Sequence, residues 1–347
     1  MLYLTTLDNQ DAKTTPMALT SDRGADGGLY IPFQMPIYTA NELQAMSEMS
    51  FSQCVAEVLN RFFSCRINAV DVDVAVGRVP VKMAAMNHRV VFAELWRNPQ
   101  NSYDRTEAEL ALRVCQGVGV EYKMTSWLRI AIRIAVMFGV FAGLMRLGAV
   151  SEHQPMDVAL PTGDFSAPMA AWYCRQMGLP IGNIICSCNE NSGVWELLHL
   201  GELHMDAQTQ KTTTPKADFA VPEEVERLIH AVFGLDEAKR YAEIKAAGRT
   251  YRPNPELNGD LRSGMFAAVV SRSRLDALIP SVYRTSSYIL GPYTALAYGG
   301  LMDYRAKTGE TRPALLLADH SPLCDSNVVA ESMRMSSYEL RAVVEKA

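Results

Sequence analysis

Hydrophobic positions along the chain form two kinds of segment, short continuous apolar runs and longer runs with helical spacing. The continuous runs lie at 90–95, 157–161, 184–188 and 314–318. Short runs of this kind are typical of strands that are buried on both faces of a parallel sheet. They predict an α/β protein whose core is a parallel sheet.

The clearest unit of this pattern lies between 157 and 191. After the first strand, Gly163 allows a tight turn, and Ser166 suits the first turn of a helix that stops at Gly178. With the apolar run that follows, strand, loop, helix and strand form one βαβ unit. Free backbone N–H groups and the helix dipole make such a loop a candidate anion site. The single glycine of TGDFS is, however, no phosphate-loop fingerprint.

Apolar residues at helical spacing predict helices around these strands. The predicted helices cover Phe51–Phe63, 106–116, 127–150, 166–178, 192–200, 223–233 and 261–278. Asn41 suits the N-cap of an earlier helix that begins ELQAM. The segment 70–76 alternates Asp with valine and alanine, and it fits either a strand or the start of a helix.

The segment 127–150 is apolar and long enough to raise the question of a membrane span. Arg129, Arg133 and Arg146 interrupt it, and an arginine inside a bilayer costs a few kcal/mol. The segment therefore predicts a buried core helix, and we expect no association with a membrane.

Composition is that of an ordinary globular protein. The chain has 347 residues, of which 48% are hydrophobic and 20% are charged, so it can bury a sizeable core. A formal net charge of −5 is not the footprint of a nucleic-acid-binding protein. Seven cysteines form no C-x-x-C pair of the kind that binds a metal, and their odd number argues against a disulfide framework. The N-terminal MLYLTTLDNQ lacks the regions of a signal peptide, so we expect a cytoplasmic protein.

The unit at 157–191 resembles the corresponding segment of threonine synthases. That family has a V-P-S-G-N-F-G loop, a helix ending M-G-L-P-I and a strand ending T-N-E-N. Here the three parts read LPTGDFS at 160–166, MGLPI at 177–181 and NEN at 189–191. Further similar stretches lie at 27–32, 94–99, 214–218, 222–228 and 288–298.

The resemblance implies the fold of type II pyridoxal-phosphate enzymes, reduced to the large domain and an N-terminal region. The phosphate loop of the cofactor would consist of Thr162, Gly163, Asp164, Phe165 and Ser166. Asp319 would approach the pyridine nitrogen, and Asn189 and His320 are the candidate substrate-binding residues. The pair Asp319–His320 could do acid–base work or form a structural hydrogen bond.

Two departures from the family bear on activity. In threonine synthases the strand at 90–95 continues E-L-F-H-G-P-T-x-A-F-K-D, and its lysine forms the Schiff base with pyridoxal phosphate. Here the run reads ELWRNPQNSYD, which puts Asp104 at the lysine position, and a carboxylate cannot form an imine. The family also has a whole α/β subdomain before the long apolar helix, whereas this chain has only the 21 residues 105–125.

We therefore expect an N-terminal region at 1–85 and an α/β domain at 86–347. Two functions stay open. In the first, the protein has lost pyridoxal-phosphate lyase activity, needs no cofactor, and binds a small molecule or a partner in a regulatory role. In the second, it is an active pyridoxal-phosphate-dependent threonine synthase or related lyase for a small (phospho)amino acid. That enzyme would use another lysine, with Lys123 or Lys82 nearest in the sequence. Lysine, subdomain and loop asparagine have all changed, which favours the first function.

We also expect a homodimer or a complex with another protein. Loss of the subdomain would uncover apolar surface around Trp96, Trp127 and 137–141. Exposed apolar patches of more than a few hundred Å² usually mark an interface.

Overall fold

The computed structural model describes residues 1–79, 81–87, 89–151, 153–254 and 261–345. Its centre is a six-stranded sheet with the strand order β10-β7-β6-β11-β5-β4, parallel except for β4, which pairs antiparallel with β5. The strands are β4 (Lys82–Asn87), β5 (Val90–Glu94), β6 (Met156–Pro161), β7 (Ile181–Cys188), β10 (Met265–Val269) and β11 (Ala314–Ala318). The predicted α/β class and the four predicted strands are confirmed.

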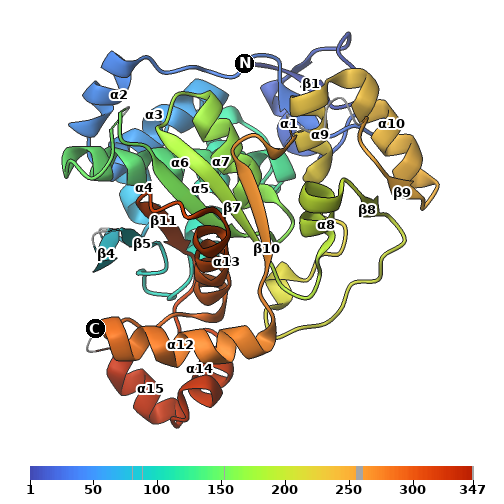
Figure 1. The fold of residues 1–347 in the computed structure, drawn as a ribbon. Helices are drawn as coiled ribbons and strands as arrows, with labels where there is room; N and C mark the ends of the chain where they lie inside the picture. The colour runs from blue at the N-terminus through green and yellow to red at the C-terminus, as the bar shows by residue number, and fades with distance from the viewer. Residues whose placement is uncertain (80, 88, 152, 255–260, 346–347) are drawn as a thin grey trace.

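Helices cover both faces of this sheet (Figure 1). One layer contains α6 (Ser126–Arg146) and α7 (Ser166–Gln176), with α3 (Phe51–Phe63) packed against α6. The other contains α13 (Pro292–Thr308) and α12 (Arg272–Ser286). In β11, Leu315 and Leu317 belong to the core under the first layer, whereas Leu316 belongs to the core under the second. Successive strand residues point to opposite faces, which explains why every residue of β11 is buried.

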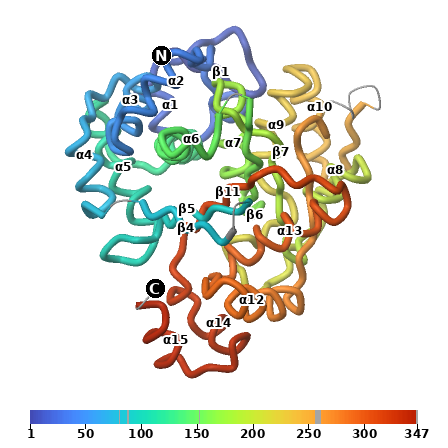
Figure 2. Tube along the Cα trace, turned by 60° about the vertical axis from the view of Figure 1, so that its left-hand side comes forward, coloured from blue at the N-terminus to red at the C-terminus, as the bar shows by residue number. Residues whose placement is uncertain are grey.

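Smaller elements surround the sheet. The N-terminal strands pair in the order β2-β1-β3, and in Figure 2 the early helices gather on the side opposite α8 and α10. The remaining elements are β1 (Leu2–Thr5), β2 (Lys13–Thr14), α1 (Thr15–Thr20), β3 (Tyr30–Pro32), α2 (Ala40–Ser47), α4 (Ala69–Ala75), α5 (Tyr103–Val118), α8 (Gly193–Leu200), β8 (Leu203–His204), η1 (Pro215–Ala217), α9 (Val225–Phe233), α10 (Leu235–Ala246), β9 (Thr250–Tyr251), α14 (Ser326–Met333) and α15 (Ser337–Val344).

The long apolar helix lies in the core, as predicted. By length and composition α6 could cross a membrane, but 78% of its most apolar window is buried inside the protein. Trp96 and Trp127 are only 7% and 1% exposed, and 137–141 is buried throughout. The prediction of exposed apolar surface at these residues is wrong, because α3 and α7 pack against α6 from two sides and Trp96 belongs to the core under α12 and α13. Association of the chain stays a prediction that these residues do not support.

One local prediction needs correction, and one open alternative is resolved. The cap of α2 is Thr39 and not Asn41: Thr39 accepts from the Glu42 N–H, and the Glu42 carboxylate accepts from the Thr39 N–H. This reciprocal capping box satisfies two helix-end donors at once. The undecided segment 70–76 is helical in α4, where Asn68 accepts from two N–H groups of the first turn.

The helix predicted at 261–278 is wrong in its middle. Residues 261–262 and 272–278 are helical, but Met265–Val269 forms β10, which pairs in parallel with β7. Ser271 separates the two elements and caps α12 by accepting from the Arg274 N–H. Alanine-rich MFAAV has a helical preference by itself, and pairing with a buried strand overrides it.

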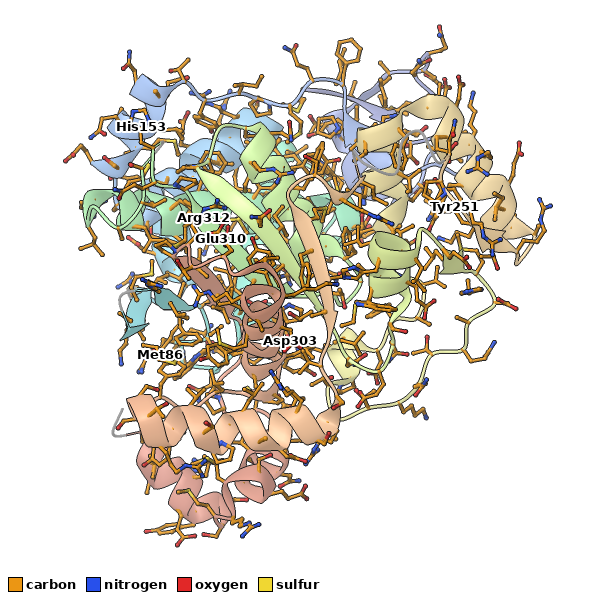
Figure 3. The ribbon with its side chains drawn as sticks, in the orientation of Figure 1. Met86, His153, Tyr251, Asp303, Glu310 and Arg312 are labelled. Carbon is orange, nitrogen blue, oxygen red and sulfur yellow. The ribbon has the colours of Figure 1, made fainter. Side chains whose placement is uncertain are left out.

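The amino ends of the parallel strands are closed by a structural ion pair. Asp157 is buried at the start of β6 and accepts from Arg312 Nη1 at 2.8 Å and from the Asn183 N–H at 2.7 Å. Arg312 also lies 3.5 Å from Glu310, and Figure 3 labels these two side chains next to each other. A candidate site therefore has to lie at the opposite end of the sheet.

Candidate functional site

The carboxyl ends of β5, β6, β7 and β11 bring the predicted site segments together. The Tyr103 N–H donates to the Asp319 carbonyl at 2.8 Å, so the start of α5 lies beside the end of β11. The Thr162 N–H donates to the Ser187 carbonyl at 3.0 Å, so the loop after β6 lies beside the end of β7. Ligands of open α/β sheets bind at this edge.

Asp104 forms a three-residue cluster with Lys216 and His320. The Lys216 ammonium pairs with the Asp104 carboxylate and lies 2.5 Å from His320 Nε2, which is 3.5 Å from Asp104. His320 and Lys216 beside the carboxylate hold the pKa of Asp104 well below its usual range. Lys216 was not predicted. It stands on η1, at a variable position of the motif at 214–218.

Asn189 holds the segment that carries Lys216. Its side-chain amide is buried and donates to Thr212 Oγ1 and Thr214 Oγ1, each at 3.0 Å, and to Asp218 Oδ1 at 2.7 Å. Its amide oxygen accepts from the N–H and the side chain of Asn191. The N–H groups and the oxygen of the Asn189 side chain are thus all bonded within the protein. Asn189 therefore positions the 212–218 segment.

The predicted phosphate loop carries its own anion. Asp164 Oδ1 accepts from the Ser166 N–H at 2.9 Å and from the Ser166 hydroxyl at 2.6 Å, at the N-terminus of α7. The other oxygen, Oδ2, accepts from Arg129 Nη1 at 3.1 Å. Burial by itself would raise the pKa of Asp164, but these hydrogen bonds and nearby guanidinium groups lower it. Gly163 and Phe165 both have positive φ, 49° and 72°, which forms the tight turn.

A second ion network joins this loop to β11. Arg133 Nε lies 3.0 Å from Glu107 Oε1, and its Nη1 donates to Asp319 Oδ2 at 3.2 Å. Arg129 Nε lies 3.5 Å from the second oxygen of Glu107. Burial raises the pKa of Glu107 against the opposing effect of the two guanidinium groups. Asp319 Oδ1 is buried and has no hydrogen-bond partner among the described residues.

Of the two lysines proposed as substitutes, Lys123 lies elsewhere. Its Nζ donates to the Thr20 carbonyl at 3.4 Å and lies 3.9 Å from Asp22, so it contacts the N-terminal region. Lys82 is the first residue of the edge strand β4 and stands opposite Glu94 in the register with β5. The lysine that contacts Asp104 is Lys216, which is 112 residues away in the sequence.

Curated relatives match parts of this chain. A protein-family model described as threonine synthase N terminus matches residues 2–78. Human threonine synthase-like 1 is 29% identical over 186 residues, which cover 50% of this chain and 24% of the human protein. Threonine synthase from Pseudomonas aeruginosa is 28% identical over 178 residues, which cover 49% of this chain and 36% of that protein. The match thus covers well under half of either relative.

Solved structures of threonine synthases are similar to this chain over most of its length. Pyridoxal-phosphate-bound threonine synthase from Brucella melitensis has a TM-score of 0.82 at 18% identity, with 96% of this chain and 91% of that chain covered. Yeast threonine synthase has a TM-score of 0.81 at 15% identity, with 96% and 90% covered. The chain thus has the fold of threonine synthases, and its N-terminal region matches the family model for the N terminus of these enzymes.

The residues at this site fit the pyridoxal phosphate of the threonine synthase family poorly. The phosphate would meet the ionised Asp164 carboxylate at the N-terminus of α7. A pyridine nitrogen beside Asp319 would also lie close to the Arg133 guanidinium, which disfavours a protonated ring. Asp104 offers no amine for an imine. Three positions that the resemblance assigns to the cofactor are thus occupied by charged groups of this chain.

Proposed function

We propose that the protein retains the threonine synthase fold without pyridoxal-phosphate lyase activity and acts as a binding or regulatory protein. The observation that carries the proposal is the Asp104–Lys216–His320 cluster at the position of the family's Schiff-base lysine. The Lys216 ammonium neutralises the Asp104 carboxylate, so neither charge needs a cofactor to balance it. The Lys216 and Asp104 side chains are 50% and 55% exposed, so this pair contributes at most about 1 kcal/mol to stability, but it leaves no free amine beside Asp104.

One observation favours the alternative, an active pyridoxal-phosphate-dependent threonine synthase or related lyase. Lys216 brings a primary amine to the carboxylate at the lysine position, although it comes from a different segment. It forms an ion pair with Asp104 as an ammonium, and an ammonium is not a nucleophile. The amine is therefore in a suitable place, but its electron pair is not available for attack on an aldehyde.

We expect no site-specific imine when the purified protein is mixed with pyridoxal phosphate. The measurement is an absorption spectrum followed by borohydride reduction and peptide mass spectrometry, because surface lysines also react slowly with aldehydes. Lys216→Met serves as the matched control, since it removes the amine nearest Asp104. A stoichiometric adduct on one lysine, with a band near the visible edge, contradicts the proposal. If that lysine is Lys216, the alternative is supported.

Asp104→Lys is expected not to restore the imine. The new ammonium would lie beside the Lys216 ammonium, and two unit charges about 4 Å apart repel by roughly 1 kcal/mol in water and several-fold more when partly buried. Asp164 would still face the phosphate. Adding Asp164→Asn and Ser166→Gly to Asp104→Lys introduces the loop residues of the family. This triple variant tests whether the charge of Asp164 also prevents the imine. A clean imine spectrum in the single variant would show that the lysine alone was missing.

A further inference from the structure

A cavity that does not include the Asp104 cluster lies between α3, α4, β4 and α6. Its volume is about 670 Å³. The apolar part of its lining consists mainly of Phe51, Val76, Val79, Val81, Met83 and Leu147. Gly143 of α6 leaves space there, because a Cβ at this position would meet only Met83 Cε, at 3.8 Å. Cavities of this size with mostly apolar walls are typical of small-molecule sites.

The apolar lining continues onto the surface at the mouth of this cavity, which we call the α4–α6 cavity. Val70 and Leu147 are 64% and 70% exposed, and both line it. Val79, which also lines it, is 36% exposed. Large exposed apolar side chains that cluster around a cavity indicate that something apolar covers them.

Three charged side chains line the same cavity, and one of them has a free charge. Asp73 accepts from the Ser52 hydroxyl, and Arg146 donates to two backbone carbonyls. The Arg78 guanidinium makes no hydrogen bond or ion pair with the residues that the structure describes. Its backbone is left-handed, with φ 58°, and its N–H donates to the Asp73 carbonyl at 2.7 Å. A non-glycine residue in this conformation often belongs to a functional site.

We propose that the α4–α6 cavity binds a small monocarboxylate with a hydrocarbon chain. Arg78 pairs with the carboxylate, and the chain lies along Val76, Val81 and Met83. Two arginines and one aspartate leave the cavity with one net positive charge, which selects an anion. The Asp73 carboxylate repels a second negative charge, so a monoanion is favoured over a dianion. The proposal does not depend on whether the site at the Asp104–Lys216–His320 cluster is catalytic.

Octanoate is the probe, and isothermal titration calorimetry is the measurement. We expect saturable binding at millimolar concentration. Hexanoate, which lacks two methylenes, is expected to bind about 15-fold more weakly, because each buried CH₂ contributes roughly fourfold in affinity. Uncharged 1-octanol is expected to bind at least about tenfold more weakly than octanoate, because it cannot pair with Arg78.

Two variants of the intact chain locate the site. Arg78→Gln is expected to weaken octanoate binding by about tenfold while leaving the binding of 1-octanol unchanged. Gly143→Leu is expected to abolish both, because its side chain grows into the cavity from a position where a Cβ has room. Leucine also has a better helix propensity than glycine, so this variant keeps the fold, which far-UV circular dichroism and the melting temperature check.

Arg341→Gln is the matched control, since Arg341 is 67% exposed on α15 and does not line the cavity. It is expected to bind octanoate like the wild type. The proposal is overturned if octanoate shows no saturable binding at concentrations up to about 10 mM. Equal affinities for octanoate and 1-octanol, or unchanged binding in a folded Gly143→Leu variant, overturn it as well.

Discussion

Replacement of Arg133 by methionine is expected to lower the free energy of unfolding by about 3–5 kcal/mol at pH 7. The Arg133 side chain is 17% exposed, and its guanidinium lies 3.0 Å from Glu107 and 3.2 Å from Asp319. Methionine retains much of the packing but leaves two carboxylates at the site without their main partner. The loss of a partner from a buried pair is costly because the remaining charge is uncompensated. Urea unfolding of both proteins measures the difference.

The pH dependence identifies the cause of this loss. Burial already raises the pKa of Glu107 above its usual value, and without Arg133 it rises further. A carboxyl with a higher pKa in the folded state binds its proton more tightly when folded, so acidification through that pKa stabilises the fold. The deficit of Arg133→Met is therefore expected to be largest near pH 7 and to shrink towards pH 5. A deficit that is constant with pH would instead indicate lost packing.

Arg341→Met is the control for this series. Arg341 lies 3.8 Å from Glu345 in an exposed pair on α15, and pairs of this kind contribute at most about 1 kcal/mol. We expect a change within about 0.5 kcal/mol and no dependence on pH. A similar loss in both variants would show that removal of any arginine has this effect.

Replacement of Arg227 by methionine is expected to cost a similar 3–5 kcal/mol. The Arg227 side chain is fully buried, and its Nε and Nη2 donate to the Tyr30 carbonyl at 3.0 and 2.9 Å. It also donates to Ser126 Oγ at 3.1 Å and pairs with Glu224, which is buried too. The variant leaves a buried carboxylate and a backbone carbonyl without these donors. One side chain thus joins β3, α6 and α9.

Arg240→Met is the matched control for Arg227→Met. Both arginines pair with a glutamate three residues earlier on a helix, but the Arg240 side chain is 41% exposed. We expect the control to lose at most about 1 kcal/mol. Limited proteolysis adds a second measurement, because loss of the Tyr30 contact is expected to make the N-terminal strands more accessible in Arg227→Met. Equal losses in the two variants would contradict the role of burial.

The buried strands could be predicted from local pattern alone. The run at 314–318 is continuously apolar, and every residue of β11 is buried between the two helix layers. The run at 265–269 gave no such signal, because Ala267 and Ala268 suit a helix as well as a strand. Its strand conformation depends on hydrogen bonds to β7, a partner about 80 residues away along the chain.

Part of the site could also be predicted, because it is a matter of residue identity. Asp104 and Asp164 stand where the threonine synthase motifs have lysine and asparagine, and this is visible without a structure. Arg129 and Arg133 were interpreted only as interruptions of an apolar helix. Their i, i+4 spacing puts both guanidinium groups on one face of α6, where a buried helix needs acidic partners. That spacing was the signal that could have indicated the ion network.

By itself, the sequence determined the α/β class, the resemblance to threonine synthases and the absence of lysine at position 104. These follow from local periodicity and from motif residues, which need no knowledge of distant contacts. The tertiary structure alone decided that Lys216 lies against Asp104, 112 residues away, and that Arg133 joins Glu107 to Asp319. Ion pairs act over a few ångströms, and only the packing of loops at one end of the sheet brings such distant charges together.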